Sequence, residues 1–227
     1  IAGPEFGDRE GHTLVIRKAL YGLCSSGLRW HERLSDVLRD MGFVQSKAER
    51  DIWMRRVDDH YEYIGVYVDD LIICSKKPTE ITDALMNEYK FKLKGSGPIK
   101  FHLGCDFFRD DEGNLCYAPR KYIEKTLENY KRIFGQYPKP EKSPLTSNDH
   151  PELDMSEELD LEETKIYQSL IGALQWVIQI GRFDICSAVS TLSRFRAFPR
   201  RGHLERVKRI HGYLRKMKFG VIRIRTQ

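Results

Sequence analysis

The sequence lacks the features of a membrane or secreted protein. No apolar run within its 227 residues reaches the length of roughly 18 residues that a membrane-spanning helix needs. The first residues, IAGPEFGDREG, contain no hydrophobic segment of the kind found in a signal peptide. The chain begins with Ile rather than Met, which indicates a fragment or a processed product. These absences predict an intracellular protein with no membrane partner.

Cysteine is scarce, and the spacing of the cysteines matches neither a disulfide pattern nor a zinc site. The five cysteines lie far apart and none belongs to a C-x-x-C pair. An odd number argues against a disulfide framework, and no group of Cys and His residues has the spacing of a structural zinc site. The cysteines are therefore expected to be reduced thiols.

Charge is unevenly distributed along the chain. Residues 194–227 contain twelve Lys and Arg and one acid, a net charge of +11, whereas residues 1–193 carry −6. Residues 149–163 contain eight acids and neither Lys nor Arg. An acidic run of this kind is usually a solvated face. The density of positive charge in the C-terminal part indicates a polyanionic partner.

The apolar patterns predict an α+β fold, in which a mostly antiparallel sheet with flanking helices is followed by a helical segment. Alternating apolar residues predict strands, and apolar residues at helical spacing predict helices. The expected strands are a short one within 14–23, then 51–57, 61–68, 70–75, 99–110 and 115–119. The expected helices are 27–43, 78–93, 120–134, 166–180, 185–195 and 203–217.

Two adjacent carboxylates, Asp69 and Asp70, separate the apolar runs 66–68 and 71–73. Asp-Asp can form the two-residue turn of a hairpin, although Gly is more favourable at the second position. Neighbouring carboxylates repel each other, so solvent or a cation must offset the repulsion. Mg²⁺ prefers a few carboxylate oxygens together with waters and substrate phosphates. The residues alone leave two alternatives open, a solvated turn and a metal site. The solvated turn is the commoner case.

The surroundings of this pair resemble the reverse transcriptase of copia-type retrotransposons. YVDD (67–70) between apolar strands is similar to the catalytic hairpin of these enzymes, and KALYGLCSSGLRW (18–30) resembles the segment that supports the incoming nucleotide and the template. FHLGCDF (101–107) resembles the primer-grip hairpin. SLIGALQW, GRFDICSAVSTLSRF and PRRGHLERVKRIHGYL are similar to the helices between the polymerase core and RNase H. The motifs span nearly the whole chain in the family's order.

The resemblance implies an RNA-directed DNA polymerase, which transfers a nucleotide from a dNTP to a primer on an RNA or DNA template. It implies that Asp69 and Asp70 bind Mg²⁺, or Mn²⁺ in its place. Two such ions about 4 Å apart can activate a 3′-hydroxyl and stabilise the leaving pyrophosphate. The implied partners are the RNase H and integrase portions of the same polyprotein and a second copy of the chain as a homodimer. The implied location is a cytoplasmic particle or the nucleus.

The resemblance also implies which residues contact the substrates. The residues expected at the nucleotide and primer are Tyr21, Gly22, Tyr67, Val68, Leu103 and Gly104. The residues expected at the nucleic-acid backbone are Arg194, Arg200, Arg201, Arg206, Arg209, Arg215 and Lys216. A helix that faces phosphates needs such cations, and a basic solvated face is the alternative. The three tryptophans, Trp30, Trp53 and Trp176, are expected to be core anchors rather than base-stacking platforms.

The expected organisation follows the same resemblance. Residues 1–116 would be a partial palm with the catalytic hairpin and the primer grip, and 117–136 a thumb-like helix. Residues 137–165 would be a Pro-rich and acidic linker. Residues 166–227 would be a basic helical thumb or connection segment that leads toward a missing RNase H domain.

The chain departs from the family pattern at three places. Cys24 stands where the family usually has a basic residue, and Phe183 stands where it usually has Pro. The family's third metal-binding carboxylate belongs to an earlier strand, and nothing before Lys18 matches its motif. We therefore expect this chain alone to be inactive. The alternative is a catalytically inactive nucleic-acid-binding remnant of such an element.

Overall fold

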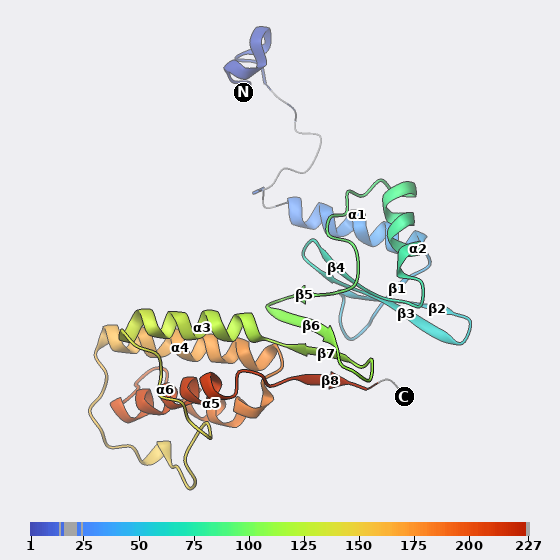
Figure 1. Cartoon of the computed structure of the whole chain (residues 1–227). Coiled ribbons are helices and arrows are strands. Elements are labelled where there is room, and N and C mark those ends of the chain that lie inside the picture. Colours follow the sequence, from blue (N-terminus) through green and yellow to red (C-terminus); the bar gives the residue numbers. More distant parts are fainter. Residues whose placement is uncertain (14, 16–21, 24, 226–227) are drawn as a thin grey trace. The chain divides into compact units, whose positions relative to one another are not determined.

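The chain forms two compact units, Ile1–Gly97 and Pro98–Gln227 (Figure 1). The computed structural model describes residues 1–13, 15, 22–23 and 25–225. Each unit has its own antiparallel sheet and its own hydrophobic core. The α+β fold class predicted from the sequence is confirmed. The strand expected within 14–23 falls largely outside the described residues.

The first unit contains one four-stranded antiparallel sheet in the order β1-β2-β3-β4. Figure 1 shows helices α1 and α2 on the same face of this sheet. The elements are η1 (Pro4–Arg9), α1 (Ser26–Asp40), β1 (Val44–Gln45), β2 (Ile52–Val57), β3 (His60–Tyr67), β4 (Asp70–Cys74), α2 (Pro78–Asp83) and the π-helix η2 (Ala84–Glu88).

The core of the first unit lies between α1, the sheet and the α2–η2 segment. Leu38 of α1, Ile64 of β3 and Leu85 of η2 are all fully buried in it. Side chains alternate between the two faces of a strand. Ile64 therefore points into the core, whereas Tyr63 and Tyr67 on the same strand are 42% and 47% exposed.

The predicted helix over 78–93 is shorter in the structure. α2 and η2 together end at Glu88. Lys90 has a φ of +61°, which lies outside the helical region and ends the helical path. The backbone N–H of Phe91 then donates a hydrogen bond to Leu85.

The second unit combines four main helices with a second antiparallel sheet, in the order β5-β6-β7-β8. Its elements are β5 (Phe101–His102), β6 (Cys105–Arg109), β7 (Leu115–Ala118), α3 (Arg120–Phe134), η3 (Pro151–Leu153), α4 (Leu161–Gln179), η4 (Phe183–Ile185), α5 (Cys186–Ser193), α6 (Arg201–Lys216) and β8 (Ile222–Ile224). Strand β8 was not predicted from the sequence. Its pairing of Ile222 with Tyr117 brings the C-terminal residues beside β7 (Figure 1).

The core of the second unit lies among α3, α4, α5 and α6. Tyr167 of α4 is fully buried there, and its hydroxyl donates a 2.7 Å hydrogen bond to the carbonyl oxygen of Leu192. Asp160 and Glu163 form a capping box at the start of α4, which satisfies backbone N–H groups that the first helical turn leaves unpaired. None of the helices in the described residues is long and apolar enough to cross a membrane.

Residues 137–160, here called the strap, lie along α6. Part of the predicted linker is therefore attached to a helix. The backbone N–H of Glu141 donates to the carbonyl oxygen of Gly212, and Arg215 donates to that of Pro138 at 2.8 Å. His203, which is 2% exposed, bonds through Nε2 to the carbonyl oxygen of Pro151 at 2.9 Å.

Candidate active site

The two carboxylates lie at the turn between β3 and β4. Tyr67 pairs with Asp70, so the two residues of the turn are Val68 and Asp69, and Asp70 is the first residue of β4. β4 therefore begins at Asp70, as the expected strand 70–75 does, whereas the expected strand 61–68 is one residue too long and a turn made of Asp69 and Asp70 is not formed. Both carboxylates are exposed.

The register of the hairpin explains this shift. Ile64 pairs with Ile73 and Val66 with Leu71, so that apolar side chains face the core together. One step further along the hairpin, Ser75 donates a 2.5 Å hydrogen bond to Glu62, a residue only 5% exposed. Because a buried carboxylate needs a polar partner, this contact favours the observed register.

The turn contains a strained residue with an external hydrogen bond. Val68 has a φ of +55°, which is unusual for a β-branched residue. The indole Nε1 of Trp30 donates a 2.9 Å hydrogen bond to the carbonyl oxygen of Val68. Trp53 is 1% exposed and anchors the core as predicted, whereas Trp30 is half-buried beside the turn and Trp176 is 38% exposed. No sequence signal distinguishes Trp30, because its contact joins residues 38 positions apart.

Asp69 and Asp70 supply oxygen ligands of the kind that a hard divalent cation prefers. Among the described residues, no group of three or more His, Cys, Asp or Glu side chains could hold a metal ion. Mg²⁺ is commonly held by one or two carboxylates, with waters and substrate phosphates completing its shell. The pair therefore fits a metal ion that arrives with a nucleotide better than a permanently bound one.

The predicted nucleotide and primer residues are distributed over both units. Tyr67 and Val68 directly precede the carboxylates, with 47% and 72% of their surfaces exposed. Gly22 is exposed and has a φ of +93°, while Tyr21 lies outside the described residues.

Leu103 and Gly104 form the turn between β5 and β6 in the second unit. Their φ values are +48° and +85°, and positive φ at both central residues is the pattern of a type I′ hairpin turn. A Cβ on Gly104 would lie 3.5 Å from Cβ of Tyr122, which is ordinary contact. Glycine is therefore favoured here by the backbone conformation.

Arg206, one of the predicted nucleic-acid contacts, lies between two acids of the strap. Its guanidinium is 2.8 Å from Asp149 and 2.5 Å from Asp154, whose side chains are 10% and 9% exposed. Burial opposes ionisation of Asp154, but hydrogen bonds from Ser156 and Arg206 outweigh it and lower its pKa to about 2. The hydrogen bond with Asp149 raises the pKa of Arg206. A solvated acidic face was expected here. That is wrong for these two acids, because they neutralise a cation within the unit.

Three more of the predicted cations each pair with one acid, at more exposed positions than Arg206. The pairs are Arg200 with Glu158 (3.1 Å), Arg201 with Glu163 (3.1 Å) and Arg209 with Glu141 (3.0 Å). Arg194 and Lys216 are exposed. The strap and the start of α4 therefore offset much of the positive charge of α6.

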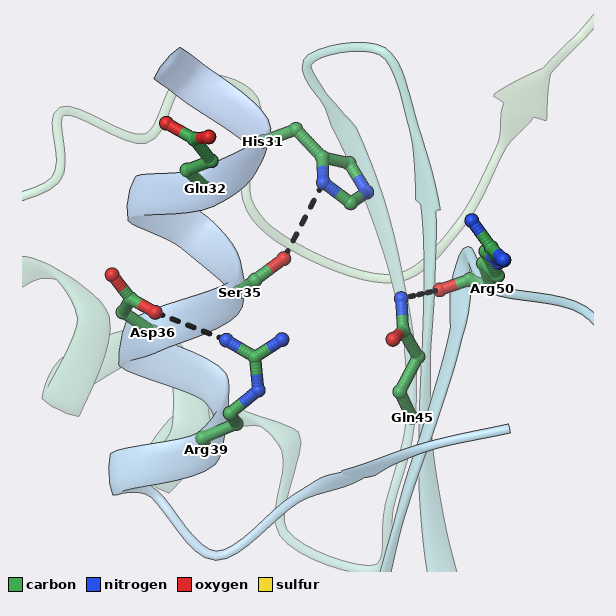
Figure 2. A pocket seen from close by; sticks show the side chains of 7 residues that line it. All are labelled: His31, Glu32, Ser35, Asp36, Arg39, Gln45 and Arg50. Carbon is green, nitrogen blue, oxygen red and sulfur yellow. Dashed lines mark hydrogen bonds and ion pairs between the residues drawn. The ribbon is translucent and has the colours of Figure 1, made fainter. Parts of the chain in front are cut away.

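A shallow polar depression of about 500 Å³ lies on the first unit, apart from the predicted site residues. Figure 2 shows side chains of α1 facing Gln45 and Arg50 across it. His31 is 3.4 Å from the Ser35 hydroxyl and 3.2 Å from Asp51. Ser35, His31 and Asp51 are thus arranged like a nucleophile, its base and an orienting acid. Ser35 borders the depression but is only 5% exposed, which is unfavourable for a nucleophile.

Comparisons with known proteins place the chain in a family. Residues 2–140 match the family model described as reverse transcriptase (RNA-dependent DNA polymerase). A putative transposon Ty5-1 protein of Saccharomyces cerevisiae is 32% identical over 200 residues, which are 86% of this chain and 62% of that protein. The retrovirus-related Pol polyprotein from transposon RE1 of Arabidopsis thaliana is 31% identical over 208 residues, or 91% of this chain and 14% of the polyprotein.

A third relative is the retrovirus-related Pol polyprotein from transposon TNT 1-94 of Nicotiana tabacum, 27% identical over 224 residues, or 94% of this chain and 16% of the polyprotein. The chain therefore spans less than two thirds of these relatives. No solved structure matches it. The family match covers more than half of the chain and includes the turn with Asp69 and Asp70. As the copia-type resemblance predicted, the chain belongs to the reverse transcriptase (RNA-dependent DNA polymerase) family.

Proposed function

We propose that the chain provides part of the palm and the following helical segment of a copia-type RNA-directed DNA polymerase. The β3–β4 turn carries this proposal. Within the segment that matches the family, it presents two exposed neighbouring carboxylates at the tip of a hairpin whose base is buried. Reverse transcriptases use divalent metal ions, and the donor chemistry of Asp69 and Asp70 favours Mg²⁺, with Mn²⁺ as a substitute.

The proposed reaction is nucleotidyl transfer. The primer 3′-oxygen attacks the α-phosphorus of the dNTP and forms a new P–O bond. The bond to the bridging oxygen breaks, pyrophosphate leaves with the bonding electrons, and the hydroxyl proton passes to solvent. A bound divalent ion supplies charge neutralisation at the attacking and leaving oxygens. Asp69 and Asp70 would hold the divalent ion at the turn, Tyr67 would lie beside the primer end, and Val68 would lie beneath the nucleotide sugar.

The wider assembly in this proposal follows the relatives. Two of them are Pol polyproteins, so we assign RNase H and integrase portions of the same polyprotein as partners. A template–primer duplex is the nucleic-acid substrate. The exposed Arg194 and Lys216 are its main proposed backbone contacts. Arg215, whose guanidinium also lies 5.1 Å from the centre of the Tyr137 ring, is a third contact. The primer-grip role belongs to the Leu103–Gly104 turn. Homodimer formation and a location in a cytoplasmic particle or the nucleus belong to the same proposal.

Incorporation of dTTP on poly(rA)/oligo(dT) tests the proposal. The chain alone is expected to be inactive, because only two carboxylates are available to the metal. When it is joined to a polyprotein segment that supplies the third carboxylate, we expect Mg²⁺-dependent incorporation that Asp69→Asn abolishes. Incorporation by the chain alone, lost in Asp69→Asn, would show that two carboxylates suffice.

The second candidate is a nucleic-acid-binding remnant without catalysis. The observation in its favour is that Arg194, Arg215 and Lys216 are exposed and can contact a duplex without any contribution from Asp69 and Asp70. Failure of the joined protein to incorporate dTTP, with duplex binding retained, is the result that supports it.

A further inference from the structure

The backbone of the catalytic turn has a conformation that its sequence disfavours. Val68 has a φ of +55°, whereas Asp69 is not among the non-glycine residues with positive φ. Positive φ at the first central residue alone is the pattern of a type II′ turn, in which that position favours Gly. Valine at this position is strained, and such strain persists only where the surrounding structure imposes it.

Trp30 contacts the turn at its central peptide group, which determines the turn type. Its indole N–H bonds to the Val68 carbonyl oxygen at 2.9 Å, and this carbonyl belongs to the peptide that joins Val68 to Asp69. Rotation of that central peptide is what converts one two-residue turn type into another, because it changes ψ of the first residue and φ of the second. With the carbonyl held, the backbone of Asp69 keeps one orientation, and the direction of its carboxylate follows.

Trp30 itself is held in place. Its ring packs edge-to-face on Phe91, with ring centres 5.5 Å apart. The guanidinium of Arg33 lies 5.8 Å from the centre of the same Phe91 ring. One turn further along α1, Leu34 is 2% exposed in the core. The hydrogen-bond donor is therefore attached to a rigid element, which is what positioning a functional group requires.

We infer that Trp30 is a positioning residue, which fixes the Val68–Asp69 peptide and thereby aims the Asp69 carboxylate toward the divalent ion. This inference rests on the proposed function. It also links the turn to the chain segment that resembles the support of the incoming nucleotide, because Trp30 is the last residue of that segment, 18–30, whose final part forms the start of α1.

Trp30→Phe tests the inference in the full chain, because it keeps an aromatic ring for Phe91 while removing the N–H donor. NMR of ¹⁵N-labelled protein follows the amides of Val68, Asp69 and Asp70, and electron paramagnetic resonance follows Mn²⁺ binding. We expect shifted, faster-exchanging amides at these residues and a Mn²⁺ dissociation constant raised about three- to tenfold, the range for one lost hydrogen bond. Trp176→Phe, in the other unit, is the control and should change neither measurement.

The wild-type chain provides a measurement that does not depend on a variant's folding. The Trp30 indole proton should exchange with solvent several-fold more slowly than that of free tryptophan. An equally fast indole proton overturns the inference, as does a folded Trp30→Phe variant with unchanged amides and Mn²⁺ affinity. If Asp69→Asn leaves Mn²⁺ affinity unchanged, the metal role in the proposed function fails. The amide measurement then decides separately whether Trp30 holds the turn.

Discussion

A Cβ atom on Gly212 would lie 2.0 Å from the carbonyl oxygen of Lys139, so α6 and the strap are in backbone contact at this point. The neighbouring hydrogen bond from the N–H of Glu141 to the carbonyl oxygen of Gly212 fixes the same contact. A second glycine of α6, Gly202, leaves room for the Asp154 carboxylate. Glycine within a helix costs stability relative to alanine, and here that cost is offset by the docked strap.

Gly212→Ala should destabilise the second unit by about 1–3 kcal/mol, because the added methyl group forces the strap away from α6. Urea unfolding followed by circular dichroism measures the change. Gly172→Ala in α4 is the matched control, because a Cβ there meets nothing within 4 Å. This control should be neutral or stabilising by about 0.5–1 kcal/mol. Equal effects of the two substitutions would contradict the close contact.

Arg206→Ala should destabilise the second unit by about 2–4 kcal/mol at pH 7, because Asp149 and Asp154 are left largely buried without their cation. Lys208→Ala is the control, since its partner Glu205 is 62% exposed and exposed pairs contribute less than about 1 kcal/mol. Denaturant midpoints of the two variants and the wild type provide the comparison.

Lowering the pH should reduce the difference in the free energy of unfolding between the wild type and Arg206→Ala. The pKa of Asp154 is lowered to about 2 in the folded chain, below its ordinary value, so its contribution is present above about pH 4 and lost as pH falls toward 2. A difference in unfolding free energy that stays constant from pH 7 to pH 2 would show that the ion pair does not cause it.

His211 should make the second unit sensitive to mild acid. The ring is fully buried, and burial lowers its pKa to about 4. The hydrogen bond to the Val207 carbonyl oxygen has the opposite, smaller effect. The folded pKa lies below the unfolded value of about 6.5, so the unfolded state binds more protons between these values. Stability is therefore complete near pH 7 and falls by about 2 kcal/mol by pH 5. His211→Phe should remove most of this loss, and an unchanged pH profile in that variant would assign the loss to another group.

Nucleic-acid affinity should depend on the paired and exposed cations of α6 to different degrees. A cation that already has two acidic partners releases few counterions from a duplex, so Arg206→Ala should leave the salt dependence of binding nearly unchanged. Lys216→Ala should lower the slope of log K against log salt by about one. Fluorescence anisotropy with a labelled duplex at several salt concentrations measures both slopes. A larger change of slope in Arg206→Ala than in Lys216→Ala would indicate that the duplex displaces the strap.

The sequence predicted the strands around the paired carboxylates and the helices of the second unit, because alternating and helical apolar spacing is a local property. It gave the start of β4 at Asp70 correctly but extended the preceding strand to Val68, which lies in the turn. The register depends on contacts such as Ser75 with Glu62, which no local pattern shows.

The contacts missed from the sequence are those between distant segments. Trp30 was expected in the core, yet its indole reaches the turn 38 residues away. Residues 149–163 were expected to be solvated because charge runs usually are, but the geometry of α6 brings Arg206 between two of these acids. The family resemblance supplied the identity of the turn, which composition and spacing alone left open.

The pairing of β8 with β7 sets the order in which the second unit can be completed during synthesis. The edge of β7 receives its partner, Ile222–Ile224, only after roughly a hundred further residues have been made. At about 5–20 residues per second, this edge stays unpaired for about 5–20 s on the ribosome. The residues of helices α3 to α6 are synthesised in that interval. We therefore expect the second sheet to be the last part of the unit to close, with its open edge prone to aggregation while the chain is being translated.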